Sequence, residues 1–181
     1  MDSLSRLRQF HFNLRVTGAI APSSARLAAA MASLAVGADN VLELGAGSGA
    51  VTNALVKVVT TEKLQAVELQ ECLAKGLKKR HPTLDVIAGS ADVALDKYAR
   101  EGSVAVVSSL PFRSLPADVK RLTVESVLRF LSVWPNSRLI QFTYGLGVPF
   151  SVGSEFQWQQ GKWILANFPP ACVWVLTRAI V

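Results

Sequence analysis

The apolar positions after residue 40 alternate between short continuous runs and longer amphipathic stretches. The short runs are rich in β-branched residues, and their length is that of buried strands; they cover residues 40–44, 64–68, 84–88, 104–110 and 138–144. Helical periodicity separates them at residues 51–59, 71–80 and 118–133. Buried strands that alternate with helices predict a parallel sheet covered on both faces.

The last two apolar runs follow a different pattern. Residues 162–167 and 173–180 are strand-like, and only a short segment with Pro169 and Pro170 separates them. Because no helix lies between these runs, they predict an antiparallel hairpin at one edge of the sheet. The tryptophan- and glutamine-rich segment 157–163 is interpreted as leading into this hairpin.

Residues 1–39 precede the alternation. One face of a helix at the N-terminus would collect Leu4, Leu7, Phe10 and Leu14. After an interruption at residues 18–22, Ser23 or Ser24 would cap a second helix that runs to Ala35. The first helix either packs on the domain surface or lies in a membrane interface with its arginines towards anionic headgroups. We therefore predict an N-terminal amphipathic helix and cap helix at residues 1–39, followed by one domain at residues 40–181.

A glycine-rich loop follows the first predicted strand. It reads Glu43-Leu44-Gly45-Ala46-Gly47-Ser48-Gly49 and leads directly into a helical stretch. Closely spaced glycines let the backbone turn sharply and approach a ligand, and a helix N-terminus offers free N–H groups. A dinucleotide fingerprint requires Gly-x-Gly-x-x-Gly, whereas here the third glycine comes one residue early. This spacing favours S-adenosylmethionine, which has no phosphate, over a nicotinamide or flavin cofactor or a plain glycine turn.

Two acidic residues stand where such a cofactor needs acceptors. Glu68 ends the second strand ~20 residues past the loop, a separation that brings a carboxylate to ribose hydroxyls. Asp92 follows the third strand and would accept a hydrogen bond from the adenine amine, although a helix N-cap explains it equally well. The predicted cofactor-binding residues are Glu43, Gly45, Ala46, Gly47, Gly49, Glu68, Leu69, Ala91, Asp92 and Ser108.

The fourth strand ends in Ser108-Ser109-Leu110-Pro111-Phe112. Ligands of open α/β sheets lie outside the carboxyl ends of the strands, so this segment is expected to face the transferred methyl group. Pro111 keeps the preceding residue extended, which exposes the Ser109 and Leu110 carbonyls to an amine. Phe112 would face a cationic nitrogen, unless it is an ordinary core residue beside a proline turn.

The charge of the chain restricts its partners without identifying them. A formal charge of +6 and a pI near 9.7 indicate a polyanion or an anionic membrane surface, and do not separate RNA from lipid. No apolar run reaches the roughly 18 residues of a spanning helix, and no signal peptide precedes the chain, so we expect a cytoplasmic protein. Cys72 and Cys172 lack metal-ligand spacing, and we expect no metal site.

With five parallel-type units and a terminal hairpin, the chain resembles class I methyltransferases. Over nearly its whole length it is similar to the soluble bacterial phospholipid N-methyltransferases, which convert phosphatidylethanolamine towards phosphatidylcholine, and to related enzymes that methylate ornithine lipids. This resemblance rests on residues 18–24, 43–49, 108–112, 141–145 and 168–174.

The resemblance implies an α/β fold with a single Rossmann-like class I methyltransferase domain. It would have a mostly parallel seven-stranded sheet with a C-terminal antiparallel hairpin, helices on both faces and an N-terminal helical extension. The implied reaction transfers methyl groups from S-adenosylmethionine to a lipid headgroup amine and leaves S-adenosylhomocysteine. The implied partners are the lipid and an anionic membrane surface, and no nucleic acid is expected. The protein would be a monomer associated with the inner face of the membrane. Tyr144 would neighbour the acceptor amine, alongside Ser109, Leu110 and Phe112.

Three alternatives remain at this point. RNA adenine dimethyltransferases share the glycine loop and a Leu-Pro-aromatic motif, and the basic charge suits RNA. Their motif begins with an asparagine that grips the adenine amine, where Ser109 stands here, and they usually carry a further helical domain that we do not expect in this chain. The other two are a methyltransferase of a soluble small amine and a membrane-surface protein without enzymatic activity.

Overall fold

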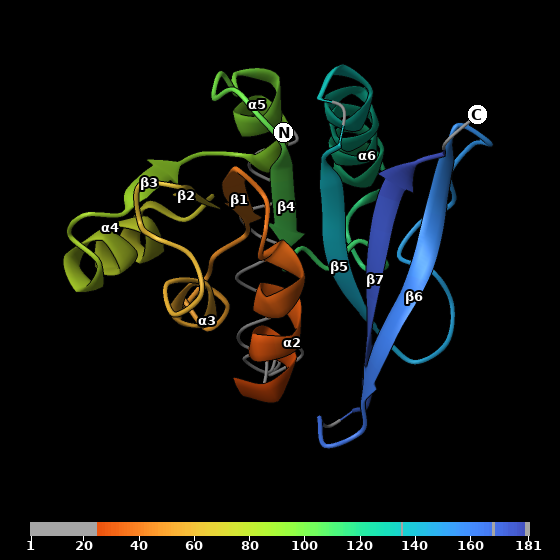
Figure 1. Ribbon diagram of the computed structural model, residues 1–181, viewed down its shortest axis with the longest axis horizontal. Helices are drawn as coiled ribbons and strands as arrows, with labels where there is room; N and C mark the ends of the chain where they lie inside the picture. The colour runs from red at the N-terminus through yellow and green to blue at the C-terminus, as the bar shows by residue number, and fades with distance from the viewer. Residues whose placement is uncertain (1–24, 135, 168, 180–181) are drawn as a thin grey trace.

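The computed structural model describes residues 25–134, 136–167 and 169–179 (Figure 1). The described strands are β1 (Asn40–Leu44), β2 (Leu64–Glu68), β3 (Asp85–Ala88), β4 (Val104–Ser108), β5 (Arg138–Tyr144), β6 (Phe156–Ile164) and β7 (Ala171–Arg178). The described helices are α2 (Ala25–Ala35), α3 (Thr52–Leu55), α4 (Glu71–Arg80), α5 (Ala91–Asp96) and α6 (Ala117–Val133). The predicted helix at residues 1–20 and the motif at 18–24 lie outside the described residues.

All of these strands form one seven-stranded sheet in the order β3-β2-β1-β4-β5-β7-β6. Strands β1 to β5 pair in parallel, whereas β7 runs antiparallel between β5 and β6. The long β6–β7 hairpin therefore lies at one edge of the sheet, as Figure 1 shows. This arrangement confirms the predicted fold, including the C-terminal hairpin.

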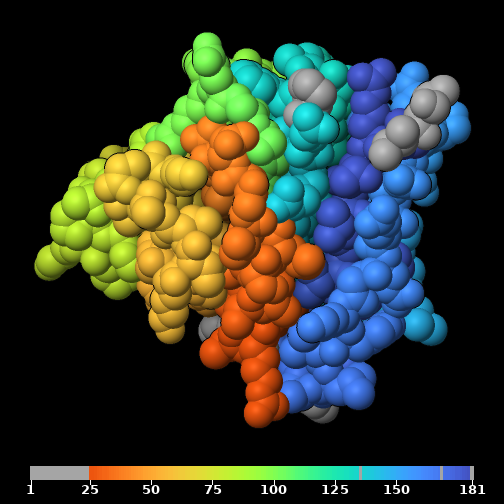
Figure 2. All heavy atoms as spheres, viewed as in Figure 1, coloured from red at the N-terminus to blue at the C-terminus, as the bar shows by residue number. Residues whose placement is uncertain are grey.

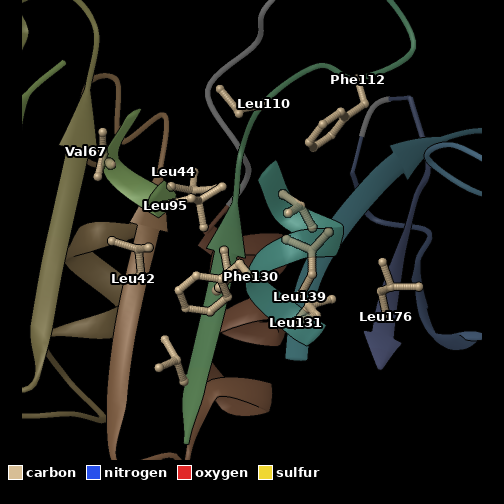
Figure 3. Packing of buried hydrophobic residues seen from close by; sticks show 14 of the residues in the cluster. Leu42, Leu44, Val67, Leu95, Leu110, Phe112, Phe130, Leu131, Leu139 and Leu176 are labelled. Atoms are coloured by element: carbon tan, nitrogen blue, oxygen red, sulfur yellow. The ribbon is translucent and has the colours of Figure 1, made fainter. Parts of the chain in front are cut away.

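Helices cover both faces of the sheet, and each face has its own core. The side chains of Leu42 and Leu44 point towards α5 and α6, where they pack with Leu95, Phe130 and Leu131 (Figure 3). The preceding residue, Val41, packs in the other core with residues of α2, α3 and α4. Because both faces are buried, the central strands are mostly apolar, which is why they appear in the sequence as nearly continuous runs.

Helix α2 belongs to one of these cores. Leu27 and Met31 are fully buried, and Figure 2 shows α2 lying beside α3 on the visible face. The Arg138 guanidinium holds the end of the helix, since its Nε donates to the Leu34 carbonyl at 2.9 Å and its Nη2 to the Val36 carbonyl at 3.0 Å. A cation at this position also suits the negative end of the helix dipole. The predicted division at residue 39 stays a prediction.

Four local predictions need correction. Strand β6 begins at Phe156, so the segment 157–163 is part of the hairpin and does not precede it. Phe156 is buried while Gln157 and Gln159 are exposed. This alternation is typical of a strand with one face towards solvent. Strand β4 ends at Ser108, before the turn at Pro111. Helix α3 covers only residues 52–55, and residues 91–96 form a short helix, α5, whose extent was not predicted.

Candidate active site

The glycine-rich loop adopts the conformation that its sequence predicts. Gly45, Gly47 and Gly49 have φ values of 74°, 56° and 85°, a region that favours glycine. A Cβ at Gly45 would come within 2.8 Å of the Leu110 Cδ2, whereas one at Gly47 would meet only the Gly45 carbonyl at 3.9 Å. The loop therefore packs tightly against the segment after β4 and leaves open space above Gly47.

Glu68 ties this loop to the neighbouring strand. Its Oε2 accepts a hydrogen bond from the Gly47 N–H at 2.8 Å, and its Oε1 accepts one from the Gln70 N–H at 2.8 Å. The residue is 4% exposed, yet an ionised carboxylate has about four lone-pair sites. Glu68 can therefore hold the loop and still accept hydrogen bonds from a ligand.

Glu43 lies beneath the loop and is fully buried. Its Oε2 accepts a hydrogen bond from the Thr52 hydroxyl at 2.7 Å, while its buried Oε1 has no hydrogen-bond partner in the described part of the chain. Burial raises the pKa of the Glu43 carboxyl to about 7, against the lowering effect of Thr52. The nearby negative charge of Glu68 raises that pKa further. Glu43 thus supports the loop from below and does not line the pocket described next.

A pocket opens outside the carboxyl ends of β1 to β4. Its lining residues are Gly45, Val67, Glu68, Leu69, Gly89, Ser90, Ala91, Asp92, Leu110, Leu115, Val119 and Thr123. Six of them were predicted: Gly45, Glu68, Leu69, Ala91, Asp92 and Leu110. Ser90 is the N-cap residue of α5, so Asp92 lies inside the first helical turn and is not the N-cap. Its carboxylate there matches the helix dipole as well as facing the pocket.

The chemistry of this lining fits S-adenosylmethionine. The described lining contains two carboxylates and no lysine or arginine. Such a set accepts hydrogen bonds from ribose hydroxyls and an adenine amine and tolerates a sulfonium cation, but it offers no cation to a pyrophosphate. Leu69, Leu110, Leu115 and Val119 supply apolar walls for a flat base. Among the described residues, no group of three or more His, Cys, Asp or Glu side chains could hold a metal ion.

The structure does not bring the other predicted residues into this pocket. Ala46 and Ser108 are buried behind it, and the Ser108 hydroxyl accepts a hydrogen bond from the Leu110 N–H at 3.2 Å. Phe112 is 1% exposed, and its ring packs on Phe150 with centroids 4.8 Å apart. Figure 3 shows Phe112 turned in towards the core after β4. Ser109 is half-buried, and its N–H donates to the Leu44 carbonyl at 2.9 Å.

Tyr144 lies on the opposite side of the sheet. Its ring packs edge-to-face on Phe142, 5.3 Å away, and both belong to the core beneath α2. Burial raises the pKa of the Tyr144 hydroxyl, against the lowering effect of a hydrogen bond with Asn167. The strand alternation therefore directs Tyr144 away from the pocket, and its role beside an acceptor amine stays a prediction.

Sequence reasoning missed the part of the pocket that comes from α6 and the segment before it. Leu115, Val119 and Thr123 form this wall, and Thr123 is 4% exposed. Helical periodicity predicted α6 itself, but not that its first turns would close the pocket. Gly89 and Ser90 were also missed, although Ser90 follows a strand and precedes a helix, which is an N-cap signal.

Comparisons with known proteins give two kinds of similarity. No protein-family model matches the chain. A ribosomal RNA small subunit methyltransferase A from Chlorobium phaeobacteroides is 33% identical over 75 residues, which are 41% of this chain and 28% of that protein. Its counterpart from Prosthecochloris aestuarii is 32% identical over 75 residues. The match thus spans just over a quarter of each relative.

Solved structures share the fold at low identity. A 23S rRNA methyltransferase, ErmE, superposes with a TM-score of 0.59 at 17% identity, over 85% of this chain and 68% of that one. An rRNA methylase from Streptococcus thermophilus gives a TM-score of 0.56 at 16% identity, over 84% and 94% of the two chains. These neighbours confirm the class I methyltransferase fold. Together with the relatives, they support the predicted enzyme class and its methyl donor, S-adenosylmethionine.

The same comparisons correct the predicted substrate. The relatives and these neighbours are rRNA methyltransferases, so the prediction of a phospholipid or ornithine-lipid substrate, a membrane partner and no nucleic acid is wrong. The glycine loop and the Leu-Pro-aromatic motif, two of the five segments on which the resemblance rested, are also shared by RNA adenine dimethyltransferases. None of the described helices is long and apolar enough to cross a membrane. The cytoplasmic location stays a prediction.

Proposed function

We propose that this chain transfers a methyl group from S-adenosylmethionine to the exocyclic amine of an adenine in RNA. The observation that carries the proposal is the 75-residue similarity to small-subunit rRNA methyltransferases. The pocket described above supports it, because its loop and its two carboxylates suit this methyl donor. Ribosomal RNA is accordingly the first substrate to test.

The residues of the pocket have distinct roles in this proposal. Bound S-adenosylmethionine supplies a methyl group activated by a sulfonium. Glu68 accepts hydrogen bonds from the ribose hydroxyls, and Asp92 accepts one from the adenine amine of the cofactor. The open space above Gly47 admits the methionine part of the cofactor close to the backbone. Leu110, held against Gly45, would supply an apolar wall beside the bound cofactor.

The acceptor nitrogen needs no general base to become a nucleophile. The exocyclic amine of adenine is neutral at physiological pH, unlike an alkylamine, whose pKa is near that of lysine at roughly 10.4. The site must therefore orient the amine and exclude water, and it need not remove a proton before the attack. This requirement agrees with a described pocket whose only titratable groups are the two carboxylates.

The charge of the chain suits an RNA partner. Its formal charge is +6, and phosphate neutralisation dominates the affinity of proteins for nucleic acids. Arg113 directly follows the Leu-Pro-Phe segment and is exposed. Its Nη1 donates to the Leu146 carbonyl at 3.0 Å and to the Tyr144 carbonyl at 3.4 Å, and its Nε and Nη2 groups remain as donors for a phosphate. We assign Arg113 to the RNA backbone beside the pocket.

The test is methyl transfer from radiolabelled S-adenosylmethionine to unmodified ribosomal RNA transcripts of both subunits. Vesicles of phosphatidylethanolamine with an anionic lipid, and a mixture of soluble amines, are run in parallel. Digestion of the RNA to nucleosides and chromatography identify the methylated base. We expect label in methylated adenosine, and little transfer by the Glu68→Ala variant. Label confined to the lipid or amine fraction would refute the proposed substrate and leave the fold and the cofactor pocket in place.

A further inference from the structure

Two exposed leucines lie at the carboxyl end of the parallel strands, where the pocket opens. Among the described residues, Leu146 and Leu165 are the most exposed large apolar side chains, at 80% and 76%. Leu146 follows the end of β5, and Leu165 follows β6 in the turn that leads to β7. Strand β7 runs antiparallel beside β5, and Tyr144 at the end of β5 pairs with Ala171 at the start of β7 (Figure 1). The loop after β5 and the hairpin turn therefore lie at the same end of the sheet.

The loop that carries Leu146 is held in one conformation. Gly145 and Gly147 have φ values of 76° and 96°, so the backbone turns on both sides of the leucine. The Gly147 carbonyl accepts a hydrogen bond from the Thr143 hydroxyl at 3.2 Å. That hydroxyl in turn accepts one from the indole N–H of Trp174 at 2.9 Å. Because these bonds fix the loop, the exposure of Leu146 is built into the fold.

Arg113 joins this loop to the wall of the pocket. Its guanidinium donates to the Leu146 carbonyl, as described above. Arg113 belongs to a compact turn, in which the Leu115 N–H donates to the Pro111 carbonyl at 3.0 Å. Leu110 and Leu115, on either side of Arg113, both line the pocket. One side chain thus separates the exposed leucine from the pocket wall, and a substrate that reaches the pocket passes close to Leu146.

The charge of these segments suits an anionic partner. Residues 109–116, 143–150 and 162–167 contain Arg113 and Lys162 and no aspartate or glutamate. Both cationic residues are exposed. Exposed apolar side chains beside cations fit unpaired RNA, whose bases offer apolar faces between the phosphates, better than a duplex, whose bases are stacked on one another.

We propose that Leu146 and Leu165 pack against unstacked bases that flank the target adenine, while Arg113 and Lys162 bind the adjoining phosphates. This inference rests on the function proposed above and adds the surface that selects unpaired RNA. An adenine must leave its stack before its exocyclic amine can enter a pocket, and its departure exposes the faces of the neighbouring bases. Apolar side chains, leucine among them, cover such faces in proteins that insert wedges between base steps.

The test compares the affinities for a short adenosine-containing single-stranded RNA and for the same RNA paired with its complement. Fluorescence anisotropy is recorded for wild-type protein, Leu146→Ser and Leu165→Ser, each saturated with S-adenosylhomocysteine. Val133→Ser is the matched control, because Val133 is 65% exposed at the end of α6, which leads to the opposite end of the strands. Each leucine variant should bind the single strand roughly 3- to 10-fold more weakly, since apolar contact area is lost. Affinities for the duplex and the cofactor should stay within about twofold of wild type, because exposed substitutions leave the fold intact.

The salt dependence of RNA affinity separates the two kinds of contact. Lys162→Gln should reduce the slope of the logarithm of affinity against the logarithm of salt concentration by about 0.7, the value for one phosphate of a single strand. Leu146→Ser should weaken binding without changing this slope, because leucine neutralises no charge.

Single-strand affinities equal to that of Val133→Ser in both leucine variants would overturn the docking surface, and would leave the proposed function intact if wild-type protein still methylates RNA. Weaker binding of both variants to anionic vesicles, with RNA affinity unchanged, would also overturn it and assign the leucines to a membrane. Wild-type protein that neither binds nor methylates RNA would refute the proposed function, and this surface with it.

Discussion

The carboxylate of Glu68 accepts a hydrogen bond from the backbone N–H of Gly47 at 2.8 Å. One side chain thus links the carboxyl end of β2 to the loop that follows β1. The prediction from sequence assigned Glu68 to the ribose of the cofactor, and the structure adds a second task. Glu68 shapes the loop before any ligand binds, so the site is pre-organised.

Replacing Glu68 should therefore impair both the cofactor and the fold. We expect Glu68→Ala to weaken S-adenosylmethionine binding by roughly 1–3 kcal/mol, the cost of losing a charged hydrogen-bond partner. The N–H groups of Gly47 and Gln70 also lose their acceptor, so the free energy of unfolding should drop. Calorimetric titration measures the first effect and urea denaturation the second.

Two further variants bracket this prediction. Glu68→Gln keeps a single amide oxygen and should lose less affinity than Glu68→Ala. Glu125→Ala removes an exposed carboxylate that pairs with Arg121 on the surface of α6, and should change neither quantity by more than about 0.5 kcal/mol. Unchanged cofactor affinity in Glu68→Ala would remove this residue from the binding site.

Local sequence signals were sufficient to predict most of the fold. Buried parallel strands appear as apolar runs, and glycine spacing marks the loop, so β1, β2, β5 and the bend at Gly45 follow directly. Strand β6 was misplaced because its glutamines hide the strand pattern: Gln157 and Gln159 face solvent at the sheet edge. An edge strand needs only one buried face, and here few apolar residues mark that face.

The site was predictable only where it depends on strand ends. Glu68 and Asp92 follow strands, and topology alone brings such residues together. Thr123 could not be found in this way, because its position depends on which face of α6 turns to the pocket. Both faces of β5 are buried, so alternation along its sequence gives no signal. The same ambiguity meant that the sequence did not show which face of β5 carries Tyr144, whose role beside an acceptor amine stays a prediction.

The bulge in the β6–β7 hairpin gives a prediction that is independent of function. The pairing register shifts between Gln160 and Trp163, and a Cβ at Gly161 would lie 2.8 Å from the Val173 carbonyl oxygen. A backbone oxygen inside a ladder cannot move aside cheaply. Gly161→Ala should therefore lower the free energy of unfolding by roughly 1–3 kcal/mol in urea denaturation.

Gly153→Ala is the matched control for this experiment. Nothing lies within 4 Å of a Cβ at Gly153. This substitution should be neutral, or stabilise by up to about 1 kcal/mol by reducing the entropy of the unfolded chain. If the two variants were equally stable, the close approach at Gly161 would not exist in solution.

The buried carboxyl of Glu43 predicts how stability depends on pH. Its pKa is about 7 in the folded protein against 4.5 for an exposed glutamate, chiefly because of burial. Between these values the folded state binds the proton more tightly than the unfolded state does. The contribution of Glu43 is therefore greatest below pH 4.5, falls as pH rises towards 7, and is constant above that. The free energy of unfolding that is lost in this way is on the order of 3 kcal/mol.

Comparison with Glu43→Gln isolates this contribution from other titrating groups. Glutamine keeps an acceptor for the Thr52 hydroxyl and does not ionise. We expect Glu43→Gln to gain stability relative to wild type between about pH 5 and about pH 8, as measured by urea denaturation at both values. A stability difference that does not change with pH would mean that Glu43 titrates as an exposed group.

The contact between Phe112 and Phe150 separates a structural role from a catalytic one. Their rings are 4.8 Å apart, and both residues are buried. We expect Phe112→Leu and Phe150→Leu each to cost about 1–2 kcal/mol of stability. The double variant should show a coupling energy of about 0.5–1.5 kcal/mol, as aromatic pairs do. If Phe112 only supports the core, both single variants should lower kcat to a similar and small extent. A large loss of kcat in Phe112→Leu alone would instead support its predicted contact with the positive charge of the reacting methyl group.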